Sequence, residues 1–194
     1  MSSGTRAAAT IDDLYKVDGK AELIDGRIVR FMPTGRKPGR VAFQIAIRLN
    51  EYAGRTGRGE VYADNVGYTV HELASGRRSF SPDASYFLGP FPENEMRFLE
   101  GPPTFAVEVR SERDSGKVAE AELAAKRADY FEAGTLAVWD VDPVAEVVRL
   151  YQADAPTQAI EFSSSDVAHA EPAVPGWRIA LIDIFKPTQR EPSP

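Results

Sequence analysis

Three acidic side chains stand where the neighbouring residues make a charge unusual. Glu108 interrupts the apolar run 105–109, a pattern typical of a strand that is buried on both faces. Asp83 follows Pro82 at the start of another predicted strand, and Glu22 enters the first strand of a predicted hairpin. A charge inside an apolar strand is strongly unfavourable unless it is paired or binds a metal ion. We therefore expect Glu108 to have a cationic partner.

Asp83 and Glu108 together would suit a divalent metal ion. An Asp and a Glu on two neighbouring strands supply two hard oxygen ligands a few ångström apart, as Mg²⁺ prefers. Mg²⁺ held in this way can activate a water molecule and neutralise a phosphodiester during hydrolysis. Zinc is not expected, because the chain has no cysteine and its two histidines, His71 and His169, lie far apart.

Lys126 is the basic residue that could act with these acids. It lies on the long helix predicted after Glu108, and its spacing of four places it on one helix face with Tyr130 and Gly134. A partly desolvated lysine near a metal-bound water can orient that water, hold a phosphate oxygen or help to accept a proton.

Each of these residues also has a purely structural explanation. Pro82-Asp83 is a common turn dipeptide. Glu108 could form a buried salt bridge with Arg110 or Lys126, and Lys126 could be an exposed residue in a helix dense with charge.

Charge is unevenly distributed along the chain. The formal net charge of −6 argues against a protein that coats nucleic acid without specificity. Residues 27–58 carry eight basic residues and one acidic residue, whereas residues 101–194 carry nine basic and sixteen acidic residues. Arg40, Gln44 and Arg48 share a four-residue spacing on a polar row of the helix predicted over about 39–54, and they are the candidates for contact with phosphates. The alternative is a solvated helix face.

Hydrophobic periodicity and turn residues predict a mixed α/β or α+β fold around one mixed sheet. Asp25-Gly26 joins two apolar runs and predicts a hairpin. The unit over 103–141 reads as strand, helix and strand, which predicts a right-handed parallel crossover. Residues 152–178 are turn-rich and weakly patterned, and no strand is predicted among them. The predicted strands are 20–24, 27–32, 60–63, 66–72, 79–88, 105–109, 136–141 and 145–151, the predicted helices are 11–15, 39–54 and 112–133, and 179–185 is a final apolar element.

The chain of 194 residues suits a single domain. We expect a disordered tail over 1–9, one domain over 10–186 and a Pro-rich tail over 187–194. The sequence contains no apolar run long enough to span a membrane and begins without the apolar stretch of a signal peptide. A cytoplasmic location is therefore expected.

Five short motifs follow one another in an order that resembles the Uma2 family, a domain of unknown function assigned to the PD-(D/E)XK nuclease superfamily. The resemblance spans about residues 10–186, and Pro175-Gly176-Trp177 adds to it near the end. The motifs are Glu22 to Val29, Pro82-Asp83, Val107 to Ser111, Lys126 to Gly134 and Trp139 to Pro143.

The resemblance implies a restriction-endonuclease-like core, in which helices flank a mixed central sheet with extra β-hairpins. It implies that Asp83, Glu108 and the backbone carbonyl of Val109 are ligands of Mg²⁺, for which Mn²⁺ would substitute. The superfamily lysine normally follows the acid by two residues, where this chain has Arg110. Lys126 matches the place on the helix to which this family moves the lysine.

The implied activity is Mg²⁺-dependent endonucleolytic hydrolysis of DNA. Asp83, Glu108 and Lys126 would be catalytic, and Glu22 would add a ligand or position Lys126. Nucleic acid is the implied partner, and a homodimer is plausible because enzymes that cut both strands often pair two sites.

One departure keeps a second class open. Relatives often carry a histidine at the start of the helix after the hairpin, where this chain has Pro38-Gly39. The alternative is a catalytically silent nuclease-fold relative that acts as a binding or assembly module. DNA or RNA as substrate, the sequence that is read and the biological pathway stay open.

Overall fold

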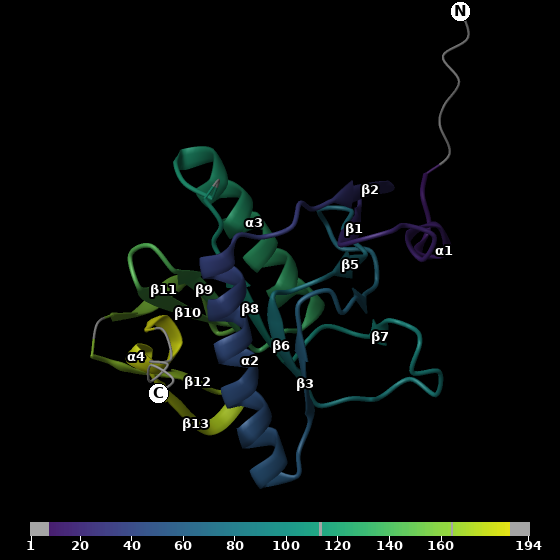
Figure 1. Ribbon diagram of the computed structural model, residues 1–194. Helices are drawn as coiled ribbons and strands as arrows, with labels where there is room; N and C mark the ends of the chain where they lie inside the picture. Colours follow the sequence, from purple (N-terminus) through teal and green to yellow (C-terminus); the bar gives the residue numbers. More distant parts are fainter. Residues whose placement is uncertain (1–7, 113, 164, 187–194) are drawn as a thin grey trace, which may run out of the picture.

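A six-stranded mixed sheet forms the centre of the computed structural model, which describes residues 8–112, 114–163 and 165–186 (Figure 1). The strand order is β11-β10-β9-β8-β6-β3, with β8 and β9 parallel and the other neighbours antiparallel. This is the mixed sheet that the sequence predicts. The strands are β3 (Glu60–Ala63), β6 (Ala84–Phe87), β8 (Phe105–Val109), β9 (Ala137–Asp142), β10 (Val147–Gln152) and β11 (Ala155–Ser163).

Two helices cover opposite faces of this sheet, α2 (Arg36–Thr56) and α3 (Lys117–Ala133) (Figure 1). Successive residues of a strand point to opposite faces. Phe105, Val107 and Val109 of β8 accordingly lie in the same core as the apolar residues of α2. Ala106 lies in a second apolar core, on the other face of the sheet, with Tyr130 of α3, and Glu108 points to that same face. The apolar strand is therefore covered on both faces, as its sequence predicts.

The unit β8–α3–β9 confirms that the predicted crossover joins two parallel neighbouring strands, with Phe105 opposite Ala137 and Val109 opposite Val141. The predicted start of the helix at residue 112 is wrong. The carboxylate of Asp114 accepts a hydrogen bond from the Ser111 N–H, and Gly116 has a φ of 89°, so the chain turns before the helix begins.

The N-terminal hairpin consists of β1 (Ala21–Ile24) and β2 (Arg27–Arg30). Its two turn residues, Asp25 and Gly26, both have positive φ, which is the geometry of a type I′ turn. Just before it, Thr10 caps the short helix α1 (Ile11–Leu14) in a reciprocal capping box with Asp13.

The strand predicted over 79–88 is wrong in its extent. It is divided into β5 (Ser79–Phe80) and β6, which belong to different sheets, because Pro82 between them has no N–H to donate to a ladder. The predicted strand 66–72 is reduced to β4 (Tyr68–Thr69), which pairs with β5 and with β7 (Leu99–Glu100).

The weakly patterned region 152–178, for which the sequence predicts no strand, contains β11, β12 (Val167–Ala170) and most of β13 (Val174–Ala180). Most of β11 is exposed, so it carries little apolar signal and is held by its pairing with β10. The final apolar element 179–185 is split between the end of β13 and the helix α4 (Leu181–Phe185).

The two ends of the domain lie near the limits of the described residues. The expected tails over 1–9 and 187–194 lie outside the described residues except for positions 8 and 9, where the Ala9 N–H donates to the Gly26 carbonyl at 2.8 Å. Among the residues that the structure describes, no helix is both long and apolar enough to cross a membrane.

Candidate active site

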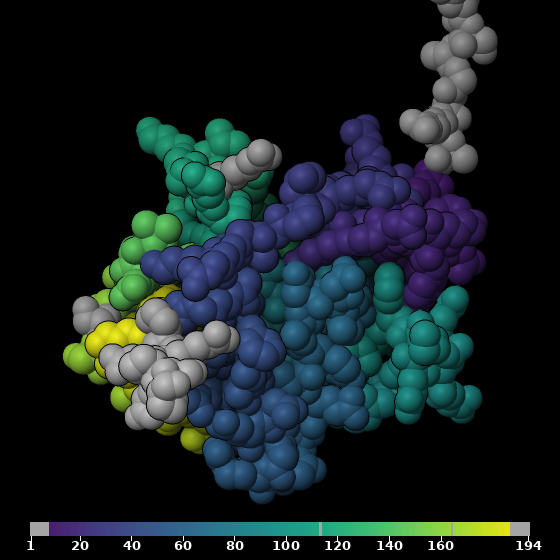
Figure 2. Space-filling model, viewed as in Figure 1, coloured from purple at the N-terminus to yellow at the C-terminus, as the bar shows by residue number. Residues whose placement is uncertain are grey.

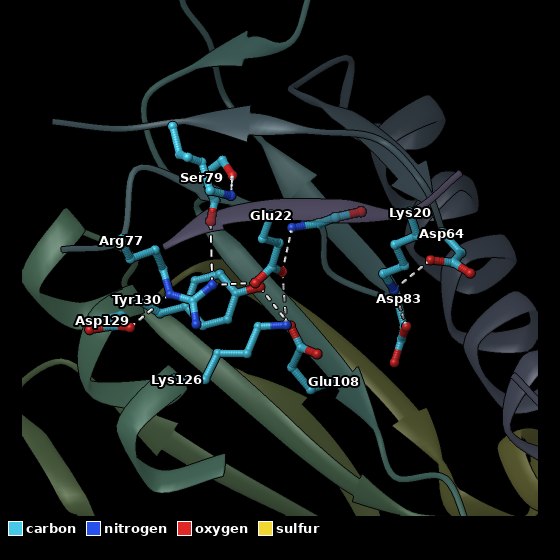
Figure 3. Close-up of polar contacts among 12 residues, drawn as sticks. Lys20, Glu22, Asp64, Arg77, Ser79, Asp83, Glu108, Lys126, Asp129 and Tyr130 are labelled. Carbon is cyan, nitrogen blue, oxygen red and sulfur yellow. Dashed lines mark hydrogen bonds and ion pairs between the residues drawn. The ribbon is translucent and has the colours of Figure 1, made fainter. Parts of the chain in front are cut away.

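Glu108 meets two side chains of α3. Its Oε1 lies 2.8 Å from Lys126 Nζ and accepts a hydrogen bond of 2.6 Å from the hydroxyl of Tyr130 (Figure 3). Lys126 and Tyr130 are four residues apart, so one turn of α3 presents both to β8. Of the structural alternatives for Glu108, the pair with Lys126 is the one that forms.

Glu22 links Lys126 to a second ion pair. Glu22 is fully buried on β1, and its Oε1 lies 3.1 Å from Lys126 Nζ and accepts the Ser81 N–H at 3.0 Å. Its Oε2 accepts a hydrogen bond from the guanidinium of Arg77, which also bonds Asp129 at 2.7 Å. Glu22 therefore holds Lys126 in place from the side opposite Glu108.

Asp83 continues the β6–β8 ladder beyond its last strand pair. The Asp83 N–H donates to the Val107 carbonyl at 3.0 Å, and Asp83 Oδ2 accepts the Val109 N–H at 2.8 Å. Asp83 Oδ1 lies 2.7 Å from Lys20 Nζ, and the same Nζ lies 2.6 Å from Asp64 Oδ1 (Figure 3). Asp83 is thereby fixed at the strand end that carries Glu108.

The two buried glutamates have opposite electrostatic environments. Burial raises the pKa of Glu108, Asp83 raises it further, and the attraction of Lys126 does not outweigh them. Burial also raises the pKa of Glu22, but Lys126 and Arg77 reverse this effect, so the net shift is downward. Burial lowers the pKa of Lys126, yet Glu108 and Glu22 outweigh it and keep the ammonium protonated.

The net negative charge around Asp83 and Glu108 suits the binding of a divalent cation. Four carboxylates and two ammonium groups form this part of the site, which has a formal charge of −2 when all six are ionised; the carboxylates are those of Glu22, Asp64, Asp83 and Glu108, and the ammonium groups are those of Lys20 and Lys126. No three His, Cys, Asp or Glu side chains within residues 8–112, 114–163 and 165–186 gather closely enough to enclose a metal ion. The donor set nevertheless fits Mg²⁺, which needs only one or two carboxylates because it keeps several water ligands.

The basic residues predicted for phosphate contact have partners within the chain. The guanidinium of Arg40 donates to the backbone carbonyls of Phe185 and Lys186, at the end of α4. Arg48 forms an ion pair of 3.2 Å with Glu51 on the same helix. Gln44 lies on α2 between them and is partly exposed. Contact of these residues with substrate stays a prediction.

Arg110, two residues after Glu108, pairs with other acids. It bonds both carboxylate oxygens of Asp140, at 2.7 and 2.8 Å, and forms an ion pair with Glu120 of α3. Arg127 completes this separate group with a bond of 3.0 Å to Asp140.

Three site residues were missed from the sequence: Lys20, Asp64 and Arg77. Lys20 precedes Glu22 by two residues, so the period of a strand places both on one side, and this signal was available. Asp64 directly follows β3 and Arg77 lies in a turn, where charged residues are ordinary. The partner of Asp64 lies 44 residues away, and the two partners of Arg77 lie 52 and 55 residues away, beyond the reach of local patterns.

A pocket of about 280 Å³ adjoins the acids, and Asp64 and Asp83 form one wall of it. Pro38, Gly39 and Phe43 from the beginning of α2 line another part. In the space-filling view, α2 and the segment around β3 form adjoining parts of one surface (Figure 2).

A mixed sheet with helices on both faces, an aspartate and a glutamate at its centre, and a lysine from the crossing helix define a nuclease-like class of protein. The profile of the Uma2 family, described as "Putative restriction endonuclease", matches residues 9–182, and the chain belongs to this family. A solved structure of "a putative nuclease belonging to DUF820" from Anabaena variabilis ATCC 29413 is similar in fold, with a TM-score of 0.70 and 19% identity. The match covers 91% of this chain and 97% of that one. No curated protein matches the chain.

Proposed function

We propose that the chain is a Mg²⁺-dependent endonuclease that hydrolyses phosphodiester bonds of DNA. One observation carries the proposal. The carboxylate of Asp83 accepts a hydrogen bond from the backbone of Val109, next to Glu108, and Lys126 of α3 forms an ion pair with Glu108. Membership of the Uma2 family supports the nuclease class, and we extend this class to Mg²⁺ dependence and a DNA substrate.

The carboxylates of Asp83 and Glu108 and the backbone carbonyl of Val109 would hold Mg²⁺. When bound, Mg²⁺ supplies positive charge that polarises a phosphodiester and lowers the pKa of a bound water. The hydrogen bond from the Val109 N–H already fixes the carboxylate of Asp83 at the end of β8, so this ligand is positioned before a metal ion binds.

Lys126 acts as a charged hydrogen-bond donor. Its raised pKa keeps the ammonium protonated near neutral pH, so orienting water or holding a phosphate oxygen suits it better than accepting a proton. Glu22 and Tyr130 are positioning residues, because Glu22 holds the ammonium of Lys126 and Tyr130 holds the carboxylate of Glu108.

The test is cleavage of supercoiled plasmid and of linear duplex DNA with Mg²⁺, with Mn²⁺ and with chelator. We expect metal-dependent cleavage by the wild type and its loss in Asp83→Asn, Glu108→Gln and Lys126→Met. Glu122→Gln and Lys117→Met change exposed residues of α3 and serve as matched controls that should keep activity.

If no metal-dependent cleavage occurs and calorimetry detects no binding of Mg²⁺ or Mn²⁺, the proposal falls and the binding or assembly module becomes the better description. RNA belongs among the substrates tested, since the acidic site does not by itself choose between the two nucleic acids. The homodimer and the cytoplasmic location stay predictions, and sedimentation of the full chain tests the former.

A further inference from the structure

Lys20 places a positive charge against a carboxylate of the proposed metal site. Its ammonium bridges Asp83 and Asp64, at 2.7 and 2.6 Å, and its side chain is only 18% exposed. Burial lowers the pKa of Lys20, but attraction by Asp83 and Glu108 outweighs burial, so the net shift is upward and the ammonium stays charged. The positive charge of Lys20 thus acts on both carboxylates that would hold a metal ion.

The two oxygens of Asp83 are held in different ways. Oδ2 accepts the Val109 N–H, a bond to backbone that packing keeps in place. Within the part of the chain that the structure describes, the hydrogen-bond partner of Oδ1 is the ammonium at the end of the long, flexible side chain of Lys20. Because a metal ion at Oδ1 would meet the ammonium of Lys20, the two cations repel one another there.

Asp64 gives Lys20 a second partner that is not one of the proposed metal ligands. Asp64 follows β3, and its side chain is 46% exposed, so its carboxylate is well hydrated compared with that of Asp83. Lys126 differs in this respect, because the side chains of its partners, Glu108 and Glu22, are only 16% and 0% exposed.

We propose that Lys20 is the resident cation of the metal-free site, that it competes with the divalent ion for Asp83, and that Asp64 retains it when the metal binds. This inference rests on the proposed function. Lys20 therefore sets the metal affinity of the site and keeps its acids neutralised when metal is absent.

The test is calorimetric titration of Mn²⁺ into the full chain, compared among the wild type, Lys20→Met, Asp64→Asn and the double variant. We expect Lys20→Met to bind Mn²⁺ at least about tenfold more tightly, because a positive charge beside the ion has been removed. Asp64→Asn should bind it more weakly, since Lys20 then has Asp83 as its remaining partner. In the double variant the effect of Asp64→Asn should largely disappear.

Metal-free thermal melts give a second measurement. Lys20→Met should melt below the wild type without metal, and saturating Mn²⁺ should close most of that difference by mass action. Lys117→Met, at the exposed start of α3, is the matched control and should leave both the Mn²⁺ affinity and the melts unchanged. Asp64→Asn changes a more exposed residue and keeps the test available if Lys20→Met does not fold.

The outcomes separate the two proposals. If Asp83→Asn loses the Mn²⁺ affinity of the wild type but Lys20→Met leaves it unchanged, Lys20 does not compete and the nuclease proposal stands. If Asp64→Asn weakens binding equally with and without Lys20, Asp64 acts through its own charge and does not retain the lysine. If neither the wild type nor Lys20→Met binds Mn²⁺ or Mg²⁺, both proposals fall.

Discussion

The carboxylate of Asp83 accepts a hydrogen bond from the backbone N–H of Val109, 26 residues further along the chain. The bond continues the ladder between β6 and β8 after the last strand pair, Ala84 with Val107. A side chain thus takes the place that a backbone carbonyl would have, and it brings an acid of a turn to the strand end beside Glu108. This bond fixes the position of Asp83 relative to Glu108 in the candidate site.

Replacing Asp83 by alanine should destabilise the metal-free protein more than replacing it by asparagine. Alanine leaves the buried Val109 N–H without an acceptor, a loss of about 1–3 kcal/mol, whereas the amide oxygen of asparagine can still accept it. Urea unfolding with chelator present measures both variants. Equal stabilities would mean that the bond to Val109 contributes nothing to the fold.

Glu108→Gln should leave the metal-free protein as stable as the wild type or more stable at neutral pH. The pKa of Glu108 is raised by burial and by Asp83, so the folded state holds its proton more tightly than the unfolded chain does. The wild type therefore loses stability relative to Glu108→Gln as pH rises above the ordinary pKa of a glutamate. Thermal melts between about pH 4 and pH 8 check this, and parallel curves for the two proteins would contradict it.

Glu22→Gln should have the opposite effect. Burial raises the pKa of Glu22, but the attraction of Lys126 and Arg77 outweighs burial, so the net shift of the pKa is downward. Ionised Glu22 therefore stabilises the folded state at neutral pH, and this stabilisation is lost as the pH falls. Removing the charge leaves Arg77 and Lys126 with one partner fewer in a buried network, a loss of about 3–5 kcal/mol. The difference from the wild type should shrink at low pH. Urea unfolding at several pH values measures it.

Lys126→Met should destabilise the metal-free protein by about 3 kcal/mol, because two buried carboxylates, those of Glu22 and Glu108, lose a shared cation. Adding Glu108→Gln should recover part of this loss, since one of the two unpaired charges is then absent. A double-mutant cycle in urea gives the coupling. Strict additivity would show that the two side chains do not act as a pair.

Arg40 and Arg48 should separate in their effects. Charge reversal at Arg40 removes two hydrogen bonds to the end of α4 and should lower the melting temperature. Arg48→Glu should change the fold less, because its ion pair with Glu51 joins side chains that are 40% and 46% exposed, and the loss of DNA affinity can then be assigned to binding. Fluorescence anisotropy over a range of salt concentrations should give a shallower slope for Arg48→Glu. An unchanged slope would return Arg48 to a solvated helix face.

Local patterns were sufficient for the hairpin at Asp25-Gly26, the apolar strand β8 and the helix that ends at Gly134. Each depends on residues that are neighbours in the chain, so turn chemistry, strand alternation and helix capping specify them. The same patterns failed for β11, whose residues are mostly exposed, and for the strand broken at Pro82.

The sequence by itself determined that Glu108 would need a cationic partner, because an unpaired charge inside an apolar strand is strongly unfavourable. Only the tertiary structure decided which partner it has. Lys126 and Tyr130 reach Glu108 because α3 crosses the face to which alternate residues of β8 point. The bridge of Lys20 between Asp64 and Asp83 joins segments 44 and 63 residues apart, and such contacts depend on packing, which no short-range spacing encodes.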